Sequence, residues 1–369
     1  MEYWISNILI VFALCVLFAG VLIPEILLIA YRRNLFDEID DRKIHHGAIP
    51  RLGGIAFEPV MLLSIALVAG GNLMLGHTEF VETLSGCGLL LIATLCSVQL
   101  LYLVGMADDL IGIKYRAKFV VQIACAVILI CGGCRFTTLA GVLGITDLHL
   151  WVSYPFTVLV TVCLINAINL IDGIDGLASG LSSVAAAIYG VSFFFLGQYT
   201  LSIISFAMLG VLCPFFYFNV FGDVRRRSKI LMGDTGSLTI GLLLCVLGTE
   251  LYTSSTTSEL EFSPAVLAFS PLIIPCFDVI RVYLLRIREH RSPFLPDRNH
   301  IHHKFLAAGA QPRTAMVSLI TVSTMLCLIN FALSTIININ LIVLLDIALW
   351  IALNLWLDYR IHLRRNQLG

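Results

Sequence analysis

Apolar stretches close to the length of a membrane span recur along the whole chain. Hydrophobic residues make up 59% of the 369 residues, and charged residues only 13%. A helix needs about 20 apolar residues to cross the hydrocarbon core of a bilayer. About eleven windows meet this requirement, at 6–31, 52–70, 84–106, 119–138, 151–168, 178–196, 201–220, 235–252, 263–285, 314–334 and 340–358. We therefore expect an all-α polytopic membrane protein with a single domain over residues 1–369.

The basic residues predict how these helices are oriented. All but one of the 23 Lys and Arg residues, the exception being Arg135, fall on one side of an eleven-helix arrangement. Loops rich in Lys and Arg stay in the cytoplasm. We expect the N-terminus outside and the C-terminus in the cytoplasm. The basic run at 225–229 is interpreted as an anchor of this topology.

Three clusters containing aspartate stand at the ends of apolar runs. They are Asp108-Asp109, the segment 169–176, and Asp234 with its flanking glycines. A carboxylate near lipid is costly, so such residues indicate function by default. All three clusters fall on the predicted cytoplasmic side. Their convergence would build a metal and phosphate site at the water interface.

Oxygen ligands recur every three residues in the middle cluster, at Asn169, Asp172 and Asp175. On a helix this spacing places them on one face. Gly173 and Gly176 would permit the close approach of a ligand. Carboxylate and amide oxygens suit Mg²⁺. The alternative is a helix N-terminus whose dipole the acids complement.

Each of the other two aspartate clusters has two interpretations. Asp234, at the start of an apolar run, is either a Mg²⁺ ligand that bridges to phosphate or an N-cap. The adjacent carboxylates of Asp108 and Asp109 repel, which suits a general base or a second metal contact. The alternative for this pair is a solvated loop end.

Two basic loops provide candidate anion-binding groups. The loop at 292–304 carries Arg298 and the run His300-Ile-His302-His303. Its proline residues and the lack of cysteine ligands favour phosphate over zinc. The loop at 42–54, punctuated by proline and glycine, is either an anion cradle or a topology anchor. Asp278 with Arg281 is interpreted as a structural ion pair.

Taken together and in order, these motifs resemble the polyprenyl-phosphate N-acetylhexosamine-1-phosphate transferase family, of the glycosyltransferase 4 type. The similarity runs from about residue 32 to 306 and rests on Asp108-Asp109 with Lys118, Asn169-Leu-Ile-Asp172-Gly-Ile-Asp175-Gly176, Met232-Gly-Asp234-Thr-Gly-Ser237 and His300-Ile-His302-His303. The His-Ile-His-His form is similar to the branch that uses UDP-N-acetylglucosamine. The peptidoglycan branch, which transfers phospho-N-acetylmuramoyl-pentapeptide, usually carries three successive histidines.

The resemblance implies a reaction and a set of roles. A polyprenyl phosphate, undecaprenyl phosphate in bacteria, would attack a UDP-sugar to give polyprenyl-diphosphate-sugar and UMP. Asp234 and Asn169 would hold Mg²⁺, with Mn²⁺ as a substitute, and Asp108 and Asp109 would be catalytic. We hypothesise direct attack, with this pair mainly positioning the acceptor. The implied substrate-binding residues are Lys43, His45, Lys118, Asp172, Asp175, Gly176, Arg298, His300, His302 and His303.

The resemblance also implies a setting. The protein would lie in the bacterial inner membrane, with a cytoplasmic active site, and would begin a cell-surface polysaccharide such as lipopolysaccharide or teichoic acid. The implied partners are the UDP-sugar, the lipid acceptor, the bilayer and a second copy in a homodimer, with no nucleic acid.

Three alternatives remain open: the peptidoglycan branch, a CDP-alcohol phosphotransferase and an ion-coupled transporter. Asp172-Gly-Ile-Asp175-Gly176 mimics the start of the CDP-alcohol motif, but its arginine and later acids are missing. A transporter would place polar groups at the midplane, often within inverted repeats.

Overall fold

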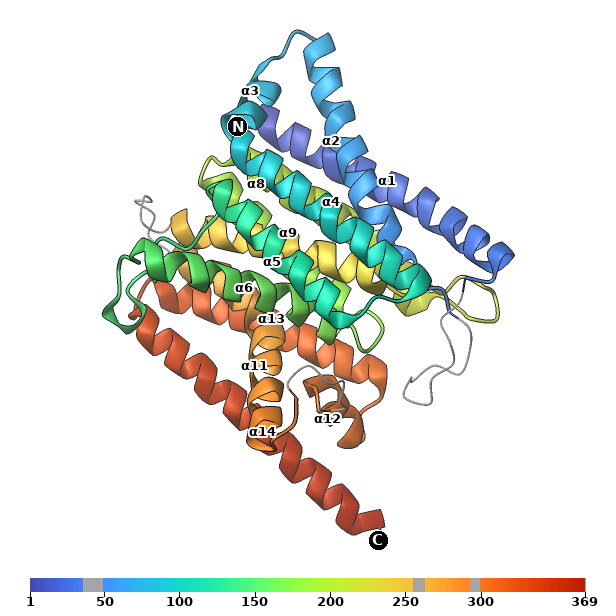
Figure 1. Ribbon diagram of the computed structural model, residues 1–369, viewed down its shortest axis with the longest axis vertical. Coiled ribbons are helices and arrows are strands. Elements are labelled where there is room, and N and C mark those ends of the chain that lie inside the picture. Colours follow the sequence, from blue (N-terminus) through green and yellow to red (C-terminus); the bar gives the residue numbers. More distant parts are fainter. Residues whose placement is uncertain (36–48, 255–262, 293–298, 369) are drawn as a thin grey trace.

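The computed structural model describes residues 1–35, 49–254, 263–292 and 299–368, and all regular structure in these ranges is helical. Figure 1 shows most of the long helices running side by side, with the N- and C-terminal ends far apart. The first half contains α1 (Glu2–Arg33), η1 (Gly53–Ala56), α2 (Phe57–Met74), α3 (Glu79–Gly86), α4 (Gly88–Ile111), α5 (Tyr115–Cys131), η2 (Val142–Gly144) and α6 (Leu150–Ile171). The second half contains α7 (Leu177–Phe195), α8 (Tyr199–Phe221), α9 (Gly233–Thr253), α10 (Pro264–Phe269), η4 (Ser270–Leu272), α11 (Ile273–Arg288), α12 (Ile301–Ala307), α13 (Pro312–Ser334) and α14 (Ile339–Leu368).

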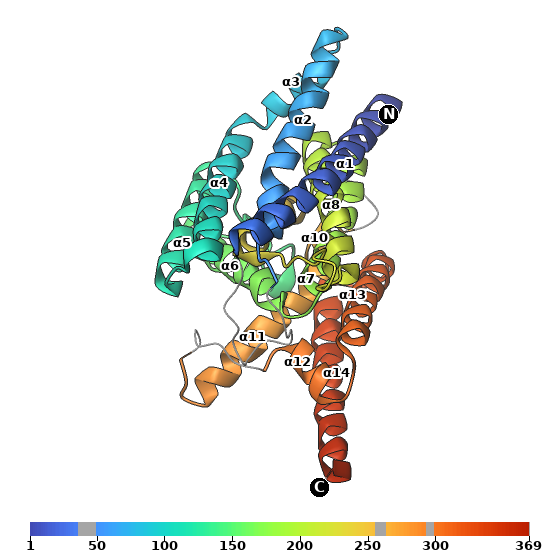
Figure 2. The same ribbon diagram turned by 90° about the vertical axis from the view of Figure 1, so that its right-hand side faces the viewer.

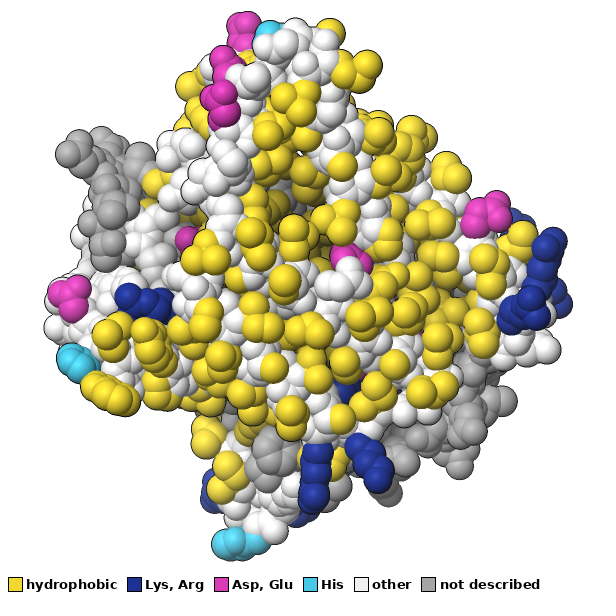
Figure 3. Space-filling model, turned by 45° about the horizontal axis from the view of Figure 1, so that its top comes forward, with side chains coloured by type: hydrophobic (Ala, Val, Ile, Leu, Met, Phe, Trp, Pro, Cys, Tyr) yellow, Lys and Arg dark blue, Asp and Glu magenta, His cyan; other side chains and the backbone are white. Residues whose placement is uncertain are grey.

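The helices have the lengths and surfaces of membrane spans. Within the described residues, ten helical segments are long and apolar enough to cross a bilayer. The face drawn in Figure 3 is largely hydrophobic, and most of the Lys and Arg side chains visible on it lie toward the right and lower edges. Apolar side chains face outward where lipid replaces water as the solvent. The prediction of an all-α polytopic membrane protein is confirmed.

Helix α9 forms the centre of the bundle. It packs against α4, α6, α7, α10 and η1. Within its most apolar stretch of 18 residues, 94% of the residues are buried. Small residues let the neighbouring backbones approach closely, as is usual between membrane helices. A Cβ on Gly105 of α4 would lie 2.5 Å from Cα of Thr235, and one on Gly54 would lie 2.0 Å from the backbone nitrogen of Gly236. These glycines bring α4 and η1 onto the first turn of α9, where Asp234 lies.

The predicted span at 263–285 is not one straight helix. It breaks at η4 into α10 and α11, and α11 then runs across the direction of the bundle (Figure 1). Pro271 and Pro275 explain the break, because proline removes a backbone donor and clashes with the preceding turn. The reorientation carries the end of α11 out of the bundle, on the side away from α14 in Figure 2.

Two other predicted spans end at different residues. The window at 119–138 corresponds to α5, which stops at Cys131 because Gly133 adopts a left-handed conformation with φ of 94°. The window at 340–358 is the apolar part of α14, whose helix continues to Leu368. The predicted basic tail is therefore a helical extension of the last span.

Candidate active site

Asp109 binds the N-terminus of α9 from the end of α4. Its carboxylate accepts hydrogen bonds from the backbone N–H groups of Asp234, at 2.7 Å, and of Thr235, at 2.9 Å. The hydroxyl of Thr235 donates a third bond, at 2.6 Å. The first N–H groups of a helix have no partner within the helix, and a carboxylate also complements the helix dipole. Asp109 therefore fixes the segment that carries Asp234.

Gly233 is the residue that makes this capping possible. Its φ is 74°, and a Cβ there would lie 2.1 Å from the carbonyl oxygen of Arg51 and 2.6 Å from a carboxylate oxygen of Asp109. A side chain would therefore exclude both the backbone conformation and the carboxylate. The glycine before Asp234 is a steric requirement of the site.

Lys118 joins Asp108 to Asp234. Its ammonium nitrogen lies 3.0 Å from Oδ2 of Asp108 and 2.7 Å from Oδ2 of Asp234. The other oxygen of Asp108 accepts the backbone N–H of Ile113, at 2.7 Å. The side chains of this triad are about one fifth exposed, so solvent reaches a cluster that is otherwise held within the protein.

Asn169 reaches the same cluster from the end of α6. Its side-chain amide donates to Oδ1 of Asp234, at 3.2 Å, and to the hydroxyl of Ser237, at 2.8 Å. Ser237 in turn donates to the carbonyl of Gly233, at 3.0 Å. The two residues predicted to hold a metal, Asp234 and Asn169, are therefore direct neighbours, although 65 positions separate them in sequence.

The donor set at this cluster fits a hard divalent cation. One carboxylate oxygen from each of Asp108, Asp109 and Asp234 lies within 4.8 Å of the others. Oxygen ligands of this kind, combined with water, are typical of Mg²⁺. Lys118 supplies positive charge beside these oxygens, which reduces the electrostatic repulsion among the three carboxylates.

Asp172 lies half-buried in the loop between α6 and α7. Burial raises the pKa of its carboxyl to about 7, and the nearby negative charges of Asp234, Asp175 and Asp109 act in the same direction. The positive charge of Arg51 opposes this shift. At neutral pH this carboxyl is close to the midpoint of its titration.

Asp175 in the same loop forms an ion pair with Lys229. Its Oδ2 lies 2.5 Å from the ammonium nitrogen, and the lysine side chain is only 9% exposed. Lys229 belongs to the basic run at 225–229 that was interpreted as a topology anchor. The structure adds a second role for Lys229, because its charge is turned into the protein and paired with Asp175, while the topology interpretation of the run stays a prediction.

Gly176 lies in a tightly packed position that its backbone conformation and hydrogen bond define. Its N–H donates to the side-chain oxygen of Asn219, at 2.6 Å, and its φ is 76°. A Cβ would lie 2.4 Å from a methyl carbon of Val220. Gly176 therefore fastens the 172–176 loop to α8 and begins α7.

Asp278 organises the histidine motif from within α11. Its carboxylate accepts from Arg281, at 2.7 Å, and from the backbone N–H of Ile301, at 2.9 Å, and it lies 2.8 Å from Nδ1 of His300. The predicted Asp278–Arg281 ion pair is confirmed. Because His300 is 4% exposed and held by this carboxylate, it supports the loop rather than facing open solvent.

His302 connects the histidine motif to the aspartate loop. A Cβ on Gly173 would lie 2.1 Å from Nε2 of His302, so the imidazole packs directly onto this glycine. The ring is 1% exposed, and burial lowers the pKa of His302 to about 3, with the neighbouring His303 and His300 adding to the shift. His302 is therefore neutral at physiological pH and carries one N–H donor.

The three histidines do not share one environment. The ring of His303 lies 4.2 Å from that of His302, measured between centroids, but His303 lines a separate cavity with α14. Lys43, His45 and Arg298 lie outside the described residues. The structure brings together Asp108, Asp109, Lys118, Asn169 and Asp234, with the 172–176 loop and His302 alongside.

Sequence reasoning missed Lys229, Arg51 and Thr235 as members of this region. Lys229 and Arg51 lie in basic segments that the positive-inside rule explains equally well. Thr235 follows Asp234 directly, and a threonine in the first turn of a helix is a local signal for capping.

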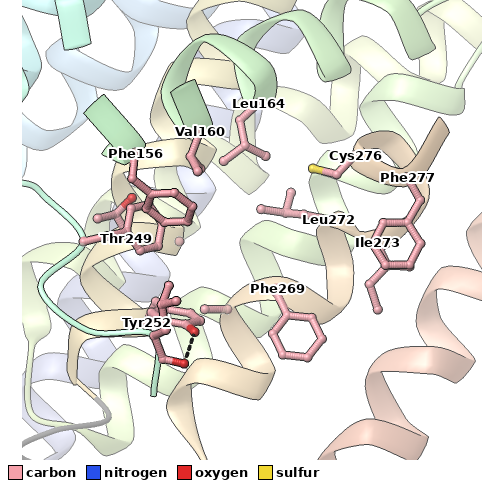
Figure 4. A pocket seen from close by; sticks show the side chains of 14 residues that line it. Phe156, Val160, Leu164, Thr249, Tyr252, Phe269, Leu272, Ile273, Cys276 and Phe277 are labelled. Carbon is pink, nitrogen blue, oxygen red and sulfur yellow. Dashed lines mark hydrogen bonds between the residues drawn. The ribbon is translucent and has the colours of Figure 1, made fainter. Parts of the chain in front are cut away.

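The apolar cavity in Figure 4 lies away from these residues. It has a volume of about 230 Å³ and is lined by α6, α9, α10 and α11, with Tyr252 donating to the carbonyl of Leu139 at 2.8 Å. Its α9 residues, Gly248 to Tyr252, begin 14 positions after Asp234, or about 21 Å along a helix. None of the predicted site residues lines it.

Comparisons with known proteins identify the family to which this chain belongs. The model of glycosyl transferase family 4 matches residues 91–252. Undecaprenyl-phosphate alpha-N-acetylglucosaminyl 1-phosphate transferase of Escherichia coli strain K12 is 32% identical over 81% of this chain and 76% of its own length. The enzyme of the same name from Salmonella typhi is 34% identical over 78% and 74%. A probable undecaprenyl-phosphate N-acetylglucosaminyl 1-phosphate transferase of Bacillus subtilis is 29% identical over 94% and 87%. The resemblance seen in the motifs is confirmed, and the chain belongs to glycosyl transferase family 4.

Proposed function

We propose that this protein transfers N-acetylglucosamine-1-phosphate from UDP-N-acetylglucosamine to undecaprenyl phosphate. The products are undecaprenyl-diphosphate-N-acetylglucosamine and UMP. The names of the relatives support the transferred group and the acceptor. The transfer would begin a cell-surface polysaccharide.

One observation carries the proposal: Lys118 contacts Asp108 and Asp234 at once, at 3.0 and 2.7 Å. Phosphoryl transfer depends mainly on positioning and on neutralising charge. A cluster of three carboxylates and one ammonium at the end of α4 and the start of α9 provides sites for both a cation and a phosphate. A purely structural helix end needs no such cluster.

We infer that Asp234 and Asp108 hold Mg²⁺, with Asp109 and Asn169 positioning Asp234. When bound, Mg²⁺ would offset charge on the donor diphosphate and on departing UMP. Asp109 already uses both oxygens to bind the N-terminus of α9. Its contribution is to fix the geometry of Asp234, and Asp108 and Asp234 present the more accessible oxygens.

The acceptor attacks the donor directly in this proposal. A phosphate monoester has a second pKa near 6, so the lipid phosphate is mostly a dianion at neutral pH. It needs no strong base to remove a proton. The contacts of Asp108 with Lys118 and with the N–H of Ile113 support a positioning role for this carboxylate.

The nucleotide end of the donor is proposed to lie along the 172–176 loop and His302. The buried Nδ1 of His302 has no hydrogen-bond partner among the described residues. A neutral imidazole accepts at one nitrogen and donates at the other, so it can form a hydrogen bond with a uracil or phosphate oxygen without carrying a charge. Asp175 and Lys229 would shape this end of the site through their ion pair.

We infer a topology of eleven spans with the N-terminus outside and the C-terminus in the cytoplasm. The 17 residues of α5 reach the lower limit of a span, which adds one to the ten apolar helices. All site residues then lie on the cytoplasmic face of a bacterial inner membrane. A homodimer is inferred from the family resemblance, and the mass of the purified protein in detergent tests it.

A donor panel tests the function. Purified protein receives undecaprenyl phosphate and Mg²⁺ with either UDP-N-acetylglucosamine or UDP-N-acetylmuramoyl-pentapeptide, and released UMP is measured by chromatography. We expect UMP from the first donor only, and none after EDTA. Turnover of the pentapeptide donor would instead assign the peptidoglycan branch, and no turnover of any UDP-sugar would contradict the transferase.

A further inference from the structure

A polar cavity lies between α12 and the C-terminal part of α14, outside the aspartate cluster. Its volume is about 400 Å³, within the range of small-molecule sites. Figure 2 shows α12 beside the lower half of α14. The lining residues are Asn299, His303, Lys304, Ala307, Asp358, Ile361, His362 and Arg365.

Positive and hydrogen-bond-donating side chains predominate in this cavity. Lys304 contributes an ammonium whose side chain is only 17% exposed, and Arg365 and His362 contribute exposed groups from the facing helix. The ammonium lies 2.8 Å from a carboxylate oxygen of Asp358 and 3.1 Å from the side-chain oxygen of Asn354. Asp358 is 55% exposed and is the acid among the described lining residues, so an incoming anion would compete with it for Lys304.

The aromatic residues of α14 place the cavity at the level of lipid headgroups. Trp356 and Tyr359 are 51% and 60% exposed, and the guanidinium of Arg360 stacks over the ring of Trp356 at 5.8 Å. Exposed Trp and Tyr side chains concentrate at membrane–water interfaces. Asp358 and His362 lie within two helical turns of these rings. A ligand in the cavity would therefore share the depth of phospholipid phosphates.

We propose that this cavity binds the anionic phosphodiester headgroup of a membrane phospholipid. The phosphate oxygens would accept from Lys304 and Arg365, with the rings of His303 and His362 as further donors. Ligands of the phosphate class occur both as lipid headgroups and as free phosphate. The headgroup depth of the cavity favours the lipid.

Such a lipid would join α14 to the helix that carries the histidine motif. His303 lines the cavity, and its ring lies 4.2 Å from that of His302, which packs on the aspartate loop. The bound headgroup would hold α12 against α14.

Native mass spectrometry of the whole protein in neutral detergent tests the proposal, with phosphatidylglycerol as the probe and phosphatidylcholine as the zwitterionic control. His362→Gln with Arg365→Gln should weaken phosphatidylglycerol binding about tenfold, because one charge-assisted contact and one further hydrogen bond are lost. Arg360→Gln removes the same charge from the same helix outside the cavity and should change the affinity less than about twofold.

A variant that should bind phosphatidylglycerol more tightly shows that a loss of binding in the other variants is not due to misfolding. Asp358→Asn removes the carboxylate that competes for Lys304, so phosphatidylglycerol should bind more tightly. Equal losses in the Arg360 variant and the cavity variant, or unchanged affinity in the cavity variants, would overturn the site. Binding of inorganic phosphate without phosphatidylglycerol would overturn the lipid assignment.

Discussion

The carboxylate of Asp109 lies on the two backbone N–H groups that follow the glycine at the start of α9, at 2.7 and 2.9 Å. Asp109 and Asp234, which this contact joins, are 125 positions apart in the sequence. At the end of α4, Asp109 therefore holds the start of α9 in place, whereas Asp108 contacts Lys118. Their substitutions should have different consequences.

Asp109→Asn should lower both stability and activity. An amide keeps one acceptor oxygen but turns an NH₂ group toward a helix N–H, so a buried donor loses its partner. We expect a loss of about 1–3 kcal/mol in the free energy of unfolding. Asp108→Asn should leave the melting temperature nearly unchanged and reduce turnover. Thermal melts in detergent distinguish the two, and equal melting shifts would show that the roles are not divided in this way.

Lys118→Gln should reduce turnover and tighten the binding of divalent cations. The ammonium shares the carboxylate oxygens that a metal would use, so its removal ends a competition. Loss of one group that stabilises developing phosphate charge typically reduces turnover about 100-fold. Titration of Mn²⁺ by electron paramagnetic resonance measures the affinity. Weaker Mn²⁺ binding in the variant would contradict shared oxygens.

Gly173→Ala should displace His302 and reduce turnover about tenfold or more, because small misplacements in a site are costly. The added Cβ would lie 2.1 Å from Nε2 of a ring that is already buried. Gly70→Ala is the matched control, since a Cβ there meets open space. UMP release and melting temperature are measured for both. Wild-type turnover in Gly173→Ala would argue against the packing of His302 on the loop.

His302 should make the protein less stable as the pH falls below about 6.5. The unfolded chain binds a proton with the ordinary histidine pKa near 6.5, whereas burial lowers the pKa in the folded state to about 3. Between these values the unfolded state binds more protons, so stability decreases as the pH decreases. The difference in melting temperature between pH 7.5 and 5 should be smaller in His302→Asn than in the wild type. Identical pH dependence would exclude a contribution from His302.

Lys229→Met should destabilise the protein because it leaves the charge of Asp175 without its nearest cation. We expect about 1–3 kcal/mol, less than for a fully buried pair. Combining it with Asp175→Asn should recover part of the loss, since both charges are then absent. Arg226→Gln, an exposed change in the same basic run, should have little effect. Additive losses in the double variant would show that the two residues do not interact.

The sequence predicted the scaffold more completely than the site contacts. Span length and apolar composition identify the helices because the bilayer imposes both. The break before α11 had a local signal in Pro271 and Pro275, yet an apolar window cannot distinguish a straight span from a broken one. Composition alone therefore gave one helix at 263–285.

Site contacts between distant residues had no local signal. Asp109 reaches across to α9, and Lys229 reaches Asp175 over 54 positions. The basic character of Lys229 was visible, but the positive-inside rule explains any lysine at a helix end. Only the packing of α4, α8 and α9 shows which charges turn inward.

The identity of the lipid product tests the central claim most directly. Purified protein is incubated with undecaprenyl phosphate, UDP-N-acetylglucosamine and Mg²⁺, and the organic phase is analysed by mass spectrometry beside an Asp234→Asn control. The account predicts undecaprenyl-diphosphate-N-acetylglucosamine from the wild type, with an equal amount of UMP, and neither from the variant. UMP without the lipid diphosphate, or the full product from Asp234→Asn, would contradict it.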